Sequence, residues 1–181
     1  MRVQLGLGLA SCLIAASTGH AAIISLTVDP SIAPNGTTTF STISSAVNVA
    51  DGDLNANNTY NVRIASGTYQ NDFATVTRPM SLVAISGPGT VTMLATTPPT
   101  NEKGIILNAS DLTVDGLIFQ GAATTSGQGD NGAGIRYQST GATLLRVENS
   151  QFIGNQNGVL TAGSGNQETV QILNFNLPQQ R

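Results

Sequence analysis

Residues 112–119, Leu-Thr-Val-Asp-Gly-Leu-Ile-Phe, and residues 145–152, Leu-Arg-Val-Glu-Asn-Ser-Gln-Phe, share one spacing of apolar side chains. In each stretch an apolar residue is followed by a second two positions later and by a third seven positions later. Alternate residues of a strand face the same side of a sheet, so the first two apolar residues point the same way. A turn residue, Gly116 or Asn149, precedes the third apolar residue, and both types tolerate a left-handed backbone.

The same spacing occurs twice more, which makes it a repeat. The four sets are Val62, Ile64 and Tyr69; Leu112, Val114 and Phe119; Leu145, Val147 and Phe152; and Val170, Ile172 and Leu177. Repeats of irregular length are typical of stacked β coils with loops at their corners. We therefore predict an all-β fold, a right-handed parallel β-helix over residues 57–181, in preference to a sandwich of short strands.

One helix is predicted before the repeats. Apolar residues recur at three- and four-residue spacing from Phe40 to Ala50, with Thr39 or Ser41 as the N-cap and Gly52 as the stop. Together with a β-rich lead-in, this helix makes up residues 22–56. An amphipathic helix at this place would cover the open end of a stack of strands.

The first 21 residues are typical of a secretory signal peptide. Arg2 provides a positive start, residues 5–16 are apolar, and small residues precede the cleavage site predicted after Ala21. We expect a secreted, periplasmic or cell-surface protein. The alternative is a lipoprotein anchored at Cys12, because residues 9–12 resemble a bacterial lipobox. No segment approaches the length of an apolar transmembrane helix.

Cleavage would remove the only cysteine, Cys12, and the only histidine, His20. This excludes Ser-His-Asp and Cys-His nucleophiles, and His- or Cys-ligated metal sites, from the mature chain. Charged residues make up only 9% of the sequence, and the loss of Arg2 leaves six basic residues against ten acidic ones. Because an acidic chain without a basic patch binds nucleic acid poorly, we predict no nucleic-acid partner.

The N-terminal half of the chain resembles the opening of the pectin-lyase-like superfamily. Residues 40–47 match Phe-x-Thr-Ile-x-x-Ala-Val, residues 64–69 match Ile-x-x-Gly-x-Tyr, and Arg78-Pro79 precedes an expected strand. The resemblance implies a right-handed parallel β-helix. It also implies that an active member would be a polysaccharide lyase or a glycoside hydrolase.

The catalytic signatures of that superfamily are absent, and Asp115, Arg146 and Glu148 are the candidates that remain. If the apolar residues around them point inward, the two carboxylates point outward at equivalent places on adjacent strands, about 4.8 Å apart. Arg146 lies on the same face. Paired carboxylates with an arginine could bind a hard cation or act on a glycosidic bond. The alternative is a solvated ladder in which Arg146 balances the two acids.

Residues 51–57 alternate Asp and Asn as a calcium-binding loop does. However, Ala56 stands where such a loop needs glycine, and Val62 stands where it needs an acid. We therefore predict no cofactor and no metal, and calcium has no motif to hold it.

The sequence as a whole predicts an exported binding protein that lacks a complete catalytic site. Its expected partner is a polysaccharide or a cell-surface molecule, and the alternative function is that of a polysaccharide lyase or glycoside hydrolase. Residues 176–181 offer no helix or polar coil to cover the last repeat. We therefore expect a truncated stack that self-associates through its open C-terminal coil.

Overall fold

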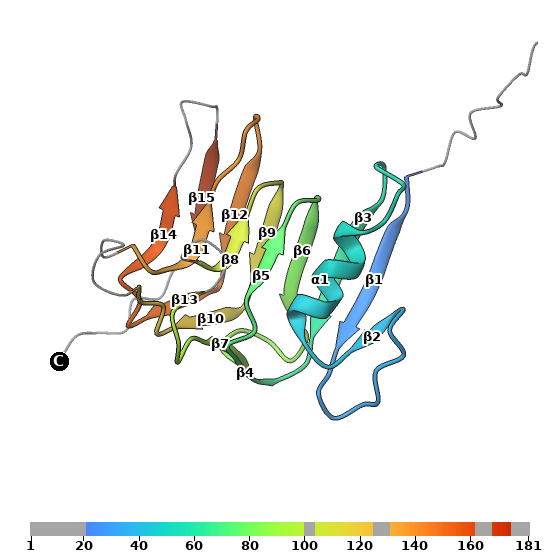
Figure 1. Cartoon of the computed structure of the whole chain (residues 1–181), viewed down its shortest axis with the longest axis horizontal. Coiled ribbons are helices and arrows are strands. Elements are labelled where there is room, and N and C mark those ends of the chain that lie inside the picture. The colour runs from blue at the N-terminus through green and yellow to red at the C-terminus, as the bar shows by residue number, and fades with distance from the viewer. Residues whose placement is uncertain (1–20, 100–103, 125–130, 162–167, 175–181) are drawn as a thin grey trace, which may run out of the picture.

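The computed structural model describes residues 21–99, 104–124, 131–161 and 168–174. These residues form three parallel sheets and one helix, α1 (Ile43–Asp51). The largest sheet, here called the long sheet, has seven strands. In spatial order they are β15 (Thr169–Leu173), β12 (Leu144–Glu148), β9 (Leu112–Asp115), β6 (Met80–Ala84), β3 (Thr59–Ile64), β1 (Ile23–Val28) and β2 (Thr39–Phe40). Figure 1 shows the strands of this sheet side by side along the length of the molecule.

The other two sheets have four strands each. The second sheet contains β13 (Gln151–Ile153), β10 (Leu117–Gln120), β7 (Val91–Leu94) and β4 (Gly67–Gln70). The third sheet contains β14 (Asn157–Thr161), β11 (Ala133–Tyr137), β8 (Gly104–Asn108) and β5 (Ala74–Val76). From β3 onward the chain enters the long, second and third sheets in turn, so that each strand pairs with the strand three places later.

This arrangement corrects the fold prediction. The sequence predicts one right-handed parallel β-helix, with a single repeat running through residues 57–181. The described residues instead form three separate parallel sheets of seven, four and four strands. Strands β1 and β2 belong to the long sheet and have no counterparts in the other two sheets. The physical reason is that the repeated spacing arises from pairs of strands joined by a bend. Such pairs determine which faces are buried, but they do not determine the number or size of the sheets.

The inward-facing residues of the repeat are nevertheless confirmed for its first three sets. Val62, Val114 and Val147 are almost fully buried, and they align through Leu82 in the register of the long sheet. The last set behaves differently, because Ile172 pairs in register with Val147 yet is 47% exposed. The repeat therefore predicts burial correctly where a further strand of the long sheet follows, and not at the last described strand.

The turn residues of the repeat are confirmed as well. Gly116, Asn149 and Asn174 each follow a strand of the long sheet and have φ values of +81°, +48° and +54°. Left-handed backbone is the region that glycine and asparagine tolerate best. A β-branched residue at any of these bends would strain the backbone where the chain leaves the long sheet.

A glycine on β11 allows the aromatic part of the core to close. Phe119 and Phe152 stack with ring centroids 5.3 Å apart and planes 14° apart. A Cβ on Gly134 would lie 2.6 Å from Phe152 Cδ1 and 2.9 Å from Phe119 Cβ, closer than real Cβ contacts. The third sheet therefore approaches the two rings to a distance that a larger residue would prevent.

Helix α1 confirms the helix prediction, although its cap differs from the expected one. Thr42, rather than Thr39 or Ser41, is the N-cap, and Gly52 ends the helix as expected. Asp72, from the turn between β4 and β5, accepts hydrogen bonds from the first helical N–H groups at Ile43 (2.6 Å) and Ser44 (3.0 Å). A carboxylate at this end satisfies unpaired donors and complements the helix dipole. The helix packs against β5, β3, β1 and β2, and so covers one end of the core (Figure 1).

The register of the long sheet can be tested with a pair of substitutions. Val147→Asp places an unpaired carboxylate in the core and should lower the free energy of unfolding by about 4 kcal/mol. Thr113→Asp, on the outward face of the neighbouring strand, should change it by less than about 0.5 kcal/mol. Urea denaturation of both variants measures the difference. Equal losses of stability would contradict the assigned faces.

Candidate functional site

The structure brings two of the predicted site residues, Asp115 and Glu148, to equivalent positions on adjacent strands. They are register partners on β9 and β12, on the outward face of the long sheet. Arg146 lies two residues before Glu148 on the same face and pairs with Thr113 of β9. The placement that the sequence predicts for these three residues is therefore the one found.

Both carboxylates are held by neighbouring side chains. Arg146 Nε donates to Glu148 Oε1 in an ion pair, and Asn149 Nδ2 donates to Asp115 Oδ1 at 2.7 Å. The Arg146 side chain is 44% exposed and that of Glu148 is 23% exposed, so the pair is partly solvated. A partly exposed ion pair of this kind contributes little to stability. Its geometry fits the alternative interpretation, a ladder in which Arg146 balances a neighbouring acid.

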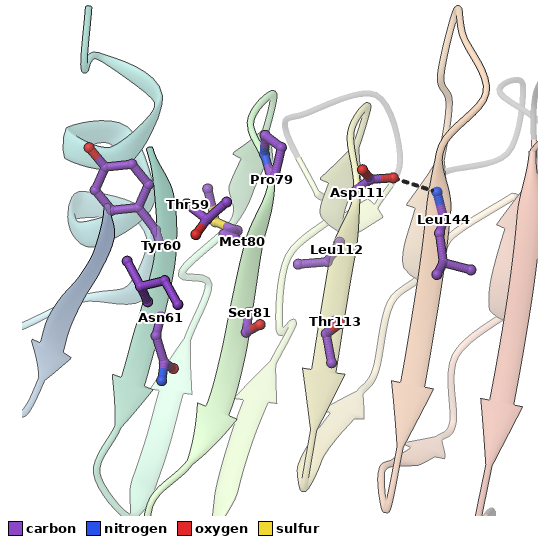
Figure 2. Close-up of a pocket in the computed structure, with 11 residues that line it drawn as sticks. Thr59, Tyr60, Asn61, Pro79, Met80, Ser81, Asp111, Leu112, Thr113 and Leu144 are labelled. Atoms are coloured by element: carbon purple, nitrogen blue, oxygen red, sulfur yellow. Dashed lines mark hydrogen bonds between the residues drawn. The ribbon is translucent and has the colours of Figure 1, made fainter. Parts of the chain in front are cut away.

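A different place on the long sheet is hollowed. A groove with a volume of about 500 Å³ crosses the amino-terminal ends of β3, β6 and β9 and reaches β12. Figure 2 shows the side chains around it. The lining residues are Ile23, Thr59, Tyr60, Asn61, Pro79, Met80, Ser81, Asp111, Leu112, Thr113 and Leu144.

Small polar side chains form a row in this groove. Asn61 pairs in register with Ser81, and Ser81 pairs with Thr113, so their side chains leave the same face of three successive strands. Neighbouring strands are about 4.8 Å apart, which sets the spacing of the row. Each member stands between two buried apolar residues of its strand. The alternation that builds the core therefore also builds the polar row.

Asp111 provides the charge of the groove. Its Oδ1 accepts a hydrogen bond from the Leu144 backbone N–H at 2.7 Å, which ties the turn before β9 to the start of β12 (Figure 2). In the described part of the chain its Oδ2 accepts no hydrogen bond and forms no ion pair. The carboxylate is exposed. Asp111 therefore has one oxygen, Oδ1, held by the Leu144 N–H, and a second, Oδ2, that can accept a hydrogen bond from a molecule in the groove.

Asn61 carries an unsatisfied acceptor beside the same groove. Its Oδ1 is buried and has no hydrogen-bond partner among the described residues. Buried polar atoms almost always have partners, and exceptions concentrate where water or a ligand completes the site. Because this oxygen is buried, a molecule in the groove would reach it only if the Asn61 side chain moved.

At one end the groove meets a closed polar network around Asp53. The Tyr60 hydroxyl and Asn58 Nδ2 donate to Asp53 Oδ2, the latter at 2.7 Å, and the Asn55 N–H donates to Oδ1 at 2.9 Å. The hydrogen bond from Tyr60, followed by those from Asn55 and Asn58, lowers the pKa of Asp53 to about 2. Burial, and then the adjacent Asp53 carboxylate, raise the pKa of Tyr60 to about 12.

The loop considered as a calcium site belongs to this network. The guanidinium of Arg78 donates to the carbonyl oxygens of Asp53 and Asn55, the second at 2.8 Å. A side-chain cation thus uses loop oxygens that a bound metal would need. Among the described residues there is also no group of three or more acidic, histidine or cysteine side chains that could hold a metal ion.

The sequence did not single out the groove residues. Asn61, Ser81, Thr113 and Asp111 are ordinary polar residues, and nothing in their local sequence marks them. The one sequence feature that could have indicated Asn61, Ser81 and Thr113 is that each is an outward-facing residue between two inward-facing apolar residues. That position becomes informative only when the partners across neighbouring strands are known.

No family model matches the chain, and comparisons with curated proteins and with solved structures found no match either. The resemblance to the pectin-lyase-like superfamily is therefore corrected as well. Its three short motifs describe a helix facing a core and a strand followed by a bend, features that any chain with these local elements can share. The motifs fall on α1, on β3 with β4, and on the residues just before β6.

Several predictions concern residues that the structure does not describe. Residues 1–20, which include Cys12, His20 and all but the last residue of the signal peptide predicted over residues 1–21, lie outside the described residues, and so does Leu177. The structure and the comparisons therefore give the signal peptide no support. Within the described ranges, no helix is both long enough and apolar enough to cross a membrane.

The Asp53 network predicts a pH dependence of stability. Because the folded-state pKa of Asp53 is lowered to about 2 from 3.8, its contribution is complete above about pH 4 and is lost as the pH falls toward 2. Asp53→Asn should therefore be less stable than the original chain near neutral pH, and this gap should shrink in acid. Urea midpoints measured across this range test the idea. A gap that stays constant would show that ionised Asp53 has no such role.

Proposed function

We propose that the protein binds a polysaccharide in the groove across β3, β6, β9 and β12. The observation that carries the proposal is the groove itself, with a volume of about 500 Å³ and a mixed lining. Small-molecule sites are concave, usually have volumes between about 300 and 1,000 Å³, and combine apolar walls with a few fixed polar groups. The groove has each of these properties.

The lining is suited to the chemistry of sugars. Sugar rings present hydroxyl groups at their edges and C–H groups on their faces. Asn61, Ser81 and Thr113 offer hydrogen-bonding groups in a row, while Pro79 and Leu144 offer apolar surface beside them.

The same residues favour binding over catalysis. The groove contains one carboxylate, Asp111, whereas hydrolysis of a glycosidic bond generally uses two acids flanking the bond. The other acids on this face, Asp115 and Glu148, lie outside the groove lining and are hydrogen-bonded to Asn149 and Arg146. With the predicted export of the chain, the polysaccharide would be extracellular, periplasmic or on a cell surface.

Filling the groove tests the proposal. Ser81→Trp places a large ring in the middle of the polar row and should abolish retention of the protein on polysaccharide gels by removing the space for sugar. Affinity electrophoresis against a panel of soluble polysaccharides measures this. Thr92→Trp, on the outward face of β7 in the second sheet, is the matched control and should leave retention unchanged.

Three results would contradict a polysaccharide site in the groove. The first is that the original chain is retained by no polysaccharide in the panel. The second is that Ser81→Trp and Thr92→Trp reduce retention equally. Binding to a cell-surface protein with no sugar requirement would point to the other kind of partner and would also count against the proposal.

We further propose that a second copy of the chain is a partner, bound at the end of the sheets opposite α1. Within the described residues, β13, β14 and β15 are the last strands of their sheets, and each has a neighbour on one side. A hollow of about 350 Å³ lies there, lined by Phe152, Gly158, Val159 and Ile172. Unpaired strand edges beside apolar side chains are a template for pairing with another chain.

Self-association should therefore depend on this end of the molecule. Sedimentation across a range of concentrations should show association of the original chain and its loss in Ile172→Lys. Leu54→Lys is the control, because Leu54 is 98% exposed in the loop between α1 and β3. A concentration-independent monomer, or equal effects of the two lysines, would contradict a second copy at this end.

A further inference from the structure

The groove continues beyond the residues described so far. A second hollow, with a volume of about 350 Å³, is lined by Asp111, Ala142, Thr143, Leu144, Thr169 and Gln171. It shares Asp111 and Leu144 with the groove, so the two hollows adjoin at these residues. Together they form one track, which crosses the amino-terminal ends of β3, β6, β9, β12 and β15.

The dimensions of this track fit an extended molecule. It crosses five strands, and four inter-strand spacings of ~4.8 Å give a length of roughly 19 Å. The row of polar side chains runs the same way, perpendicular to the strands. A chain of several sugar rings can contact this whole length, whereas a single ring would contact only one part of it.

The charge of the track is also distinctive. Among its lining residues Asp111 is the carboxylate, and neither hollow has a lysine, an arginine or a histidine in its lining. The Tyr60 hydroxyl is neutral near pH 7 and donates to Asp53 Oδ2. Arg146 lies on the same row, in register with Thr113 and Gln171, and its charge is paired with Glu148.

We propose that the ligand is a polyhydroxylated chain without anionic groups that lies across the strands, and that Asp111 determines this specificity. The inference rests on the proposed function and narrows its substrate class. Asp111 lies where the two hollows meet, with Oδ1 fixed by the Leu144 N–H and Oδ2 open to accept from a ligand hydroxyl. The same charge repels a carboxylate, sulfate or phosphate on a ligand, because no lining cation offsets it.

Isothermal titration with three oligosaccharides of matched length tests the assignment. The probes are a neutral xylohexaose, an anionic hexagalacturonate and a cationic chitosan hexamer. The neutral oligomer should bind at least about tenfold more tightly than the anionic one. It should also bind more tightly than a neutral trimer, which contacts only part of the track.

Asp111→Asn is the decisive variant, since its Oδ1 can still accept from the Leu144 N–H and preserve the turn. It should narrow the preference for the neutral over the anionic oligomer by about tenfold. Asp115→Asn removes a carboxylate at the far end of β9, outside the track, and should leave the preference unchanged. Both variants should show the thermal unfolding of the original chain.

Tighter binding of the anionic oligomer than of the neutral one would overturn this inference while leaving a polysaccharide site in place, whereas the cationic oligomer should bind at least as tightly as the neutral one. An unchanged preference in Asp111→Asn would overturn it too. If none of the three oligomers and no polysaccharide of the panel is bound, the proposed function fails and this inference fails with it.

Discussion

Parallel pairing between strands three places apart in the chain is the constraint on which the rest of the structure depends. It forces the chain to change direction after every strand, and each change breaks the regular backbone hydrogen bonding. At the bends, side chains form hydrogen bonds with the backbone groups that the strands leave unpaired. Asn155 accepts from the Ala122 N–H and donates to the Phe119 carbonyl, at 2.8 and 2.9 Å. Ser150 accepts from the Leu117 N–H and donates to the Glu148 carbonyl, at 3.2 and 2.7 Å.

This constraint explains the unusual composition of the chain. Short polar side chains reach nearby backbone groups without the cost of burying a charge, so bends favour asparagine, serine and threonine over lysine and glutamate. Only 9% of the residues are charged as a result. The outward rows of the long sheet inherit the same chemistry, since strict alternation places one outward residue between each pair of core residues. A groove formed on such a face is therefore polar and nearly uncharged.

Local features of this protein could be predicted from sequence, and their assembly could not. The inward residues Val62, Val114 and Val147, the left-handed bends at Gly116 and Asn149, and the pairing of Asp115 with Glu148 all follow from spacing within short stretches. The right-handed β-helix and the superfamily resemblance were wrong because those stretches do not determine how many sheets form. The capping of α1 by Asp72 and the groove at Asp111 depend on contacts between residues that are distant in the chain. No local sequence pattern predicts such contacts.

The pairing of β6 with β9 is the most direct test of the whole account, because the core, the bends and the groove all depend on this register. Ser81 and Thr113 are register partners on the outward face, so cysteines there should form a disulfide under mild oxidation. Cysteines at Ser81 and Arg146, two strands apart at roughly 10 Å, should not. Replacing Cys12 with serine removes the one native thiol. Mass spectrometry should find a disulfide between positions 81 and 113 and none between positions 81 and 146. A disulfide between positions 81 and 146, or no disulfide in either variant, would contradict the account.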